Sequence, residues 1–311
     1  MDSLLKPFTP KKAAFGRHET FALRYGWLTK GFQALQVDPH IFNSDASTVV
    51  LGVGKNMVNS IRYWLRATQM IEATEEGWQA TELGQSIFAE EGWDPYLEDE
   101  ATLWLIHWML ATNSELATAW YWFFNCFHKT EFNSEEAGND LARFVRENLK
   151  GKHSERTVRH DINVLLKMYS QGKQGVKVEI EDILDAPLAS LKLITPSQHS
   201  HYFQCRNTAQ DNLPLAIVAF AVNEIFNQRK LAILPISELM YGENLGIAVG
   251  SVFKLTEGEL LAKLELIVGN YPDIFNINET AGINQLYRQK ENKSSVSFLQ
   301  DYYENKDRAT S

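Results

Sequence analysis

The feature that most constrains the fold is an apolar, aromatic-rich segment in the middle of the chain, residues 103–124. Polar side chains interrupt it at His107 and again at Asn113, Ser114 and Glu115. Neither remaining piece therefore has the about 20 apolar residues that a helix needs to span a bilayer. We expect no membrane span, and instead a buried helical hairpin whose core holds Trp104, Trp108, Trp120, Trp122, Phe123 and Phe124.

Helical periodicity dominates the rest of the chain. Apolar residues recur at three- and four-residue spacing in residues 15–32, 55–71, 141–149 and 157–169. Strand signals are short, such as the turn Glu75-Glu76-Gly77 between two short candidate strands. The pattern predicts a mainly α protein with short β-hairpins and no fixed-period repeat.

Composition shifts divide the chain near residues 98–100 and 172–190. Gly172-Lys173-Gln174-Gly175 is typical of a flexible connection, and the alternating residues 176–180 follow it. We predict three modules: a winged-helix DNA-binding module (1–98), an aromatic-rich helical module with a second basic helix-turn-helix-like segment (99–185), and a helical scaffold or partner module (186–311).

The winged-helix prediction rests on the order of elements in the first module. A short helix (46–53), a glycine turn (52–54) and an amphipathic helix (55–68) precede the hairpin. In a winged helix-turn-helix, the second of these helices enters the major groove. Its polar face carries Lys55, Asn56, Asn59, Arg62 and Arg66, and Asn and Arg suit adenine and guanine edges. A helix-turn-helix used only for protein contacts is the alternative.

The net charge of −9 conceals strong local asymmetry. Residues 1–71 carry a net charge of +5, residues 72–100 contain ten acids and no lysine or arginine, and residues 143–177 carry +6. Each basic segment could follow a phosphate backbone, although an ordinary solvated surface has the same composition. In the second segment, a helix capped by Ser154 is predicted to present Arg156 and Arg159 to DNA.

The densest polar cluster lies near the N-terminus, between Gly16 and Lys30. On a helix, Arg17 and Arg24 share one face and could clamp phosphates together with Lys30. His18 beside Glu19 could supply a general base with a polarising carboxylate. The alternative is that His18 and Glu19 form an internal, structural hydrogen-bonded pair.

Motifs for a cofactor are weak. Gly52-Val53-Gly54-Lys55-Asn56 lacks both the first glycine and the hydroxyl residue of a phosphate-binding loop. Asp94, Glu98 and Asp99 could bind magnesium, but they extend an acidic surface. Pro272-Asp273 with Glu291-Asn292-Lys293 matches a loose restriction-nuclease pattern. We expect at most Mg or Mn, used to activate a water, and no nucleotide or organic cofactor.

Cysteine usage indicates a reducing compartment. Cys126 and Cys205 are too few for a disulfide framework, and both have apolar neighbours. Together with the lack of a signal peptide, this predicts a cytoplasmic protein.

Several motifs resemble a bacterial family of unknown function that is met in DNA phosphorothioation gene clusters. These motifs are residues 15–21, 23–28, 51–58, 102–108 and 121–125. The resemblance covers almost the whole chain and implies the SspB-type DNA-nicking component of such a defence system. It carries over no catalytic residue. The expected partners are duplex DNA and other phosphorothioation-system proteins, and a non-enzymatic DNA-binding adaptor is the alternative.

Overall fold

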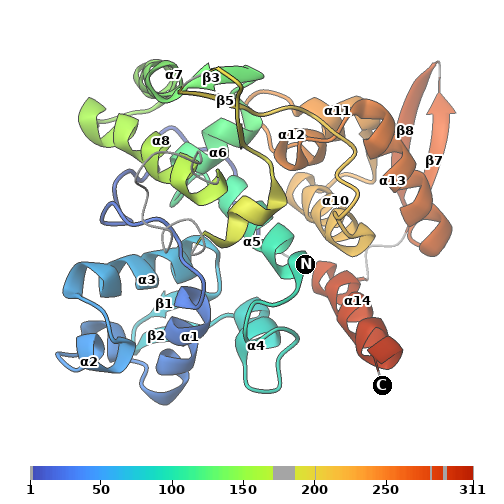
Figure 1. The fold of residues 1–311 in the computed structure, drawn as a ribbon. Helices are drawn as coiled ribbons and strands as arrows, with labels where there is room; N and C mark the ends of the chain where they lie inside the picture. Colours follow the sequence, from blue (N-terminus) through green and yellow to red (C-terminus); the bar gives the residue numbers. More distant parts are fainter. Residues whose placement is uncertain (1–2, 171–185, 200, 281, 290–292, 311) are drawn as a thin grey trace. The chain divides into compact units, whose positions relative to one another are not determined.

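The computed structural model describes residues 3–170, 186–199, 201–280, 282–289 and 293–310, and the chain forms two compact units (Figure 1). The N-terminal unit contains residues 9–123 and 128–205, and the C-terminal unit contains residues 1–8, 124–127 and 206–311. Both are mainly helical, with small antiparallel sheets, as the periodicity predicts. No helix in the described ranges is long and apolar enough to span a membrane.

The first module surrounds helix α3. Its elements are α1 (Trp27–Val37), α2 (Ser47–Leu51), α3 (Lys55–Ala67), β1 (Ile71–Thr74), β2 (Gly77–Ala80) and α4 (Glu82–Phe88). Strands β1 and β2 pair antiparallel, with Ile71 opposite Ala80. Gly31 of α1 packs so closely on α3 that a Cβ there would lie 2.5 Å from Cγ2 of Ile61. This contact fixes how α1 crosses α3.

The aromatic segment forms the predicted buried helices α5 (Glu100–Ala111) and α6 (Thr118–Asn125). Every residue of α5 from Ala101 to Ala111 is buried. Between the two helices, the Asn113 amide donates to the carbonyl oxygen of Ala67 at 2.9 Å. The polar interruption therefore ties the end of α3 to this core.

Helices α7 (Ser134–Asn148) and α8 (Glu155–Tyr169) complete the N-terminal unit with strands β3 (Glu131–Asn133), β4 (Thr195–Pro196) and β5 (Tyr202–Gln204). Helix α7 begins seven residues before the predicted start, because Asn133 and Glu136 form a capping box. Ser154 caps α8 as predicted, accepting from the Thr157 amide.

The C-terminal unit contains α10 (Leu215–Arg229), β6 (Ile233–Pro235), α11 (Ile236–Tyr241), α12 (Val249–Phe253), α13 (Glu257–Asn270), β7 (Phe275–Thr280), β8 (Ile283–Arg288) and α14 (Ser295–Thr310). The first residues of the chain join it. One Glu224 carboxylate oxygen of α10 accepts from the Ser3 hydroxyl at 2.8 Å and the Leu4 amide at 2.6 Å. The other oxygen accepts from Ser295, at the start of α14, at 2.6 Å.

One order of elements recurs three times, although the sequence shows no fixed-period repeat. A helix and a short strand precede two helices (three in the C-terminal unit) and a final hairpin, whose last strand pairs in the centre: β3-β5-β4 and β6-β8-β7. In the first module the single carbonyl of Pro39, which accepts from the Trp78 amide, takes the place of the first strand. The last described α-helices before each hairpin are α3, α8 and α13. Because each of these helices precedes a hairpin, the charges on their outer faces can be compared.

The finer division into three modules remains a prediction. Helix α5 starts at Glu100, next to the predicted boundary at residues 98–100, and both sides of that boundary belong to the N-terminal unit. The predicted connection at residues 172–175 and the alternating stretch 176–180 lie outside the described residues.

Candidate nucleic-acid interface

The polar face of α3 is assembled as the sequence predicts. Val58, Ile61, Trp64 and Leu65 are buried beneath it. On the outer face Lys55, Asn56 and Arg66 are exposed, while Asn59 and Arg62 are half-buried. The helix contains three cations and no acidic residue, so all the charges that it carries are positive.

Two guanidinium groups of this face share one aromatic ring of the hairpin. The Arg62 and Arg66 guanidinium carbons lie 5.6 and 5.8 Å from the centre of the Trp78 ring, within cation–π range. Arg62 also donates to the side-chain oxygens of Asn43 at 3.2 Å and Asn59 at 3.4 Å. Burial, and then the charge of Arg66, lowers the pKa of Arg62. Arg62 is therefore held by three side chains, whereas Lys55 and Arg66 are more exposed.

The predicted helix across residues 15–32 is wrong in its first half. Helix α1 starts only at Trp27. Before it, Gly16, Glu19 and Thr20 have φ of 69°, 50° and 69°, and Gly26 has 75°. Left-handed backbone at these positions breaks a right-handed helix and makes a turn instead. Arg17 and Glu19 are exposed on this turn.

His18 is completely buried at the centre of the turn. Its ring stacks on Trp64 of α3, with ring centres 5.8 Å apart and planes inclined by 7°, and it meets Tyr63 and Trp120 edge-on. The Thr20 amide donates to Nδ1 at 3.2 Å, so the proton lies on Nε2. Nε2 then donates to Asp161 Oδ1 of α8 at 3.1 Å.

Asp161 is the partner that sequence analysis did not identify. It is 1% exposed, and besides His18 it accepts from the Gly16 amide at 3.0 Å. We call His18 and Asp161 the latch, because they join the turn at residues 16–20 to both α3 and α8. A signal was available: Asp161 stands on the apolar face of α8, between Val158, Ile162 and Leu165. With both ring nitrogens occupied, His18 has the geometry of a positioning residue, and its catalytic role with Glu19 stays a prediction.

The two other predicted phosphate clamps are differently placed. The Lys30 ammonium donates to the Leu51 carbonyl oxygen at 3.2 Å and so satisfies the end of α2. Arg24 is half-buried, with its guanidinium 5.8 Å from the centre of the Trp27 ring. Arg17 and Lys30 are both exposed, but the Lys30 ammonium is already engaged by the Leu51 carbonyl oxygen.

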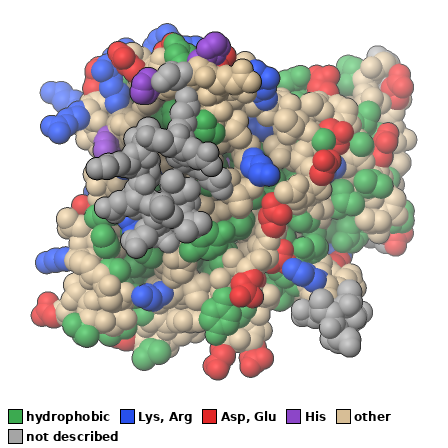
Figure 2. Space-filling view, in the orientation of Figure 1, with side chains coloured by type: hydrophobic (Ala, Val, Ile, Leu, Met, Phe, Trp, Pro, Cys, Tyr) green, Lys and Arg blue, Asp and Glu red, His purple; other side chains and the backbone are tan. Residues whose placement is uncertain are grey.

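The second basic surface lies around the start of α8. Lys150, Lys152 and Arg156 are exposed there, whereas Arg159 pairs with Glu155 at 3.3 Å. The Lys150 amide donates to the Pro10 carbonyl oxygen at 2.7 Å, which brings the N-terminal lysines to the same place. Figure 2 shows Lys, Arg and His side chains gathered over α7 and α8. The fold therefore joins parts of two charge blocks that are separate in the sequence.

The predicted metal sites do not assemble among the described residues. Asp94 is buried and accepts from the Glu98 amide, the Asp99 amide and the Thr102 hydroxyl, so its oxygens are occupied. Asp273 is exposed, and Glu291 and Asn292 lie outside the described ranges. Within those ranges no three His, Cys, Asp or Glu residues are grouped to hold a metal.

The fold and these surfaces define a mainly helical protein with two cationic helix faces in one unit. Two solved structures are similar to it, each 26% identical: one described as "Magnesium ion-bound SspB crystal structure" (TM-score 0.82, covering 94% of this chain and 89% of that chain) and one as "SspB crystal structure" (0.81, 95% and 90%). Among curated proteins, none matches.

A family model described as "Protein of unknown function (DUF4007)" matches residues 15–303. The chain belongs to this family. The predicted resemblance to an SspB-type protein is thereby confirmed, over nearly the full length of the chain.

Proposed function

We propose that the chain binds duplex DNA as a component of a bacterial DNA phosphorothioation system. The observation that carries the proposal is the outer face of α3, which presents Lys55, Asn56, Asn59, Arg62 and Arg66 without a single acid. On this proposal α1–α3 with β1–β2 is a winged helix-turn-helix, and α3 enters the major groove. The similarity to SspB structures over most of both chains supports the cellular context.

The α8 surface would contact the phosphate backbone of the same duplex. Arg17, Arg156 and the lysines at 150 and 152 supply sequence-independent contacts, and Arg159 and Arg24 add weaker ones because they are already engaged. The latch supports this arrangement, since it fixes α3 and α8 within one unit through a single buried pair. A rigid pair of surfaces binds a continuous duplex more tightly than two independent ones.

Salt dependence of binding tests this proposal. Each neutralised phosphate contributes a slope of about −0.9 to log K against log salt for duplex DNA. We expect a steep negative slope for a labelled duplex followed by fluorescence anisotropy. A flat slope, or no binding in low salt, would refute the DNA-binding function.

DNA nicking is the second candidate function, and the magnesium-bound description of one similar structure favours testing it. The test incubates supercoiled plasmid with the protein and Mg²⁺ or Mn²⁺, with a chelator as control. Open circles that disappear in His18→Ala or Glu19→Ala protein, while those variants remain folded and bind DNA, would support the predicted catalytic roles. Intact supercoils with every metal would favour a non-enzymatic adaptor that delivers partner proteins.

A further inference from the structure

The C-terminal unit contains a hollow lined by three of its elements. Helices α11 and α13 and the turn into β8 enclose about 380 Å³. Most of the lining is apolar, and its members are Ile236, Met240, Leu260, Leu261 and Ile283. Ser237, Glu257 and Asn284 supply the polar lining, so apolar side chains would be bound here beside a carboxylate.

Large apolar side chains are also exposed at this hollow: Ile283 lines it, and the Tyr241 hydroxyl donates to Glu257 of the lining. Ile283 is 52% exposed and Tyr241 54%. Exposed apolar surface that gathers around a hollow marks an interaction site more often than scattered residues do. Figure 2 shows hydrophobic and acidic side chains over the elements that Figure 1 labels α11, α13 and β7.

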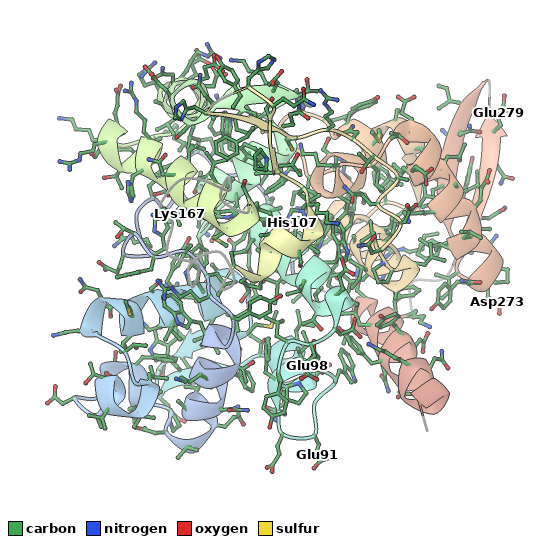
Figure 3. The ribbon with its side chains drawn as sticks, viewed as in Figure 1. Glu91, Glu98, His107, Lys167, Asp273 and Glu279 are labelled. Atoms are coloured by element: carbon green, nitrogen blue, oxygen red, sulfur yellow. The ribbon has the colours of Figure 1, made fainter. Side chains whose placement is uncertain are left out.

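The exposed charges around the hollow are negative. On helix α13, Glu257 and Glu265 are exposed and Glu259 is half-buried, whereas its one lysine, Lys263, is buried and donates to the Leu213 carbonyl oxygen at 3.4 Å. Glu279 of β7 stands opposite Asn284 in the hairpin and is labelled in Figure 3. This surface repels phosphates and attracts cations.

We propose that the α11–α13 face docks a segment of a partner protein that carries large apolar side chains flanked by lysine or arginine. The hollow accepts the apolar side chains, and the glutamates pair with the flanking cations at the rim. Complementary rim charges select the partner and speed its association. The site lies in one compact unit and does not depend on DNA binding by the other.

Two fluorescein-labelled amphipathic peptides with the same leucine spacing test the proposal, one with lysines and the other with glutamates at the polar positions. The full chain should bind the lysine peptide at least about tenfold more tightly, and the difference should shrink as salt screens the charges. Ile283→Glu should weaken lysine-peptide binding at least about tenfold, since it places a charge in the apolar lining. Glu257→Gln, which keeps the size and the acceptor for Tyr241, should weaken it about threefold.

Val37→Glu and Glu91→Gln are the matched controls, because both residues are exposed and lie in the other unit (Glu91 is labelled in Figure 3). Neither should change peptide binding. Equal affinity for both peptides, or an unchanged affinity in Ile283→Glu, overturns the proposal. A concentration-dependent dimer that Ile283→Glu converts to monomer also overturns it, since a second copy would then cover the face.

Discussion

Helices α3 and α13 each directly precede a hairpin, β1–β2 and β7–β8, yet their outer surfaces carry opposite charges. Helix α3 has three cations and no acid, while α13 has three glutamates and one buried lysine. Their inner faces are alike, with Val58, Ile61 and Leu65 in one and Leu260, Leu264 and Ile267 in the other. Apolar periodicity thus specifies the packing, and the outward residues alone decide which partner is attracted.

The largest expected effect comes from reversing the charges on α3. Lys55→Glu with Arg66→Glu should weaken duplex binding by at least about 100-fold at moderate salt and flatten the salt slope, because each lost phosphate contact removes about 0.9 from it. Anisotropy titrations at several salt concentrations measure both quantities. Arg206→Glu with Lys230→Glu, in the other unit, makes the same change in net charge and should leave the slope unchanged. Equal losses of duplex affinity in both double variants would show that net charge, and not the α3 surface, determines DNA binding.

The next largest effect is expected on stability, from breaking the latch between His18 and Asp161. The described contacts of α13 include no such buried His–Asp pair. His18→Ala leaves the buried Asp161 carboxylate without its side-chain donor, which should cost about 2 kcal/mol of unfolding free energy. Urea unfolding measures this loss, and His40→Ala is the exposed control.

His18→Gln restores a donor without the stacked ring. We expect it to bind a duplex of about one turn, roughly 10 base pairs, normally and a longer one several-fold more weakly. If His18→Gln weakened binding of the short and the long duplex equally, His18 would not act by positioning the two surfaces.

Alkaline pH should destabilise both units. Burial raises the pKa of Tyr63 well above 10 and raises the pKa of Cys126 to about 12. Above about pH 9 these groups ionise in the unfolded state and not in the folded one, so the unfolding free energy falls as pH rises, by at most about 1.4 kcal/mol per pH unit for each group.

Urea unfolding at pH 8 and pH 10.5 checks this sign. Tyr63→Phe and Cys126→Ala should each reduce the difference between the two pH values. A wild-type protein that gains stability between them would contradict the burial argument.

The smallest effect is expected at Trp78, the ring shared by Arg62 and Arg66. Trp78→Leu removes the cation–π contacts and should weaken duplex binding about threefold, with the salt slope unchanged because no charge is lost. Trp78→Phe keeps a ring face and should recover most of the affinity. If the slope changes in Trp78→Leu, the ring does more than orient the two guanidinium groups.

Local sequence patterns were sufficient for part of this molecule. The inward positions of α3, the β1–β2 hairpin and the aromatic helices α5 and α6 follow from periodicity and turn residues. The turn at residues 16–20 does not, because its backbone is held by Asp161, which is 145 positions away from Gly16. Contacts between distant segments also decide that Lys30 caps α2 and that Lys150 lies beside Pro10.

The anchoring of Ser3 and Leu4 on Glu224 has a consequence for biosynthesis. A chain made from its N-terminus completes the segments of the N-terminal unit when Cys205 has been added, before α10 exists. Domains generally fold as units during synthesis, earlier ones first. During synthesis, Ser3 and Leu4 therefore lack their final contacts until α10, a helix more than two hundred positions later, has left the ribosome.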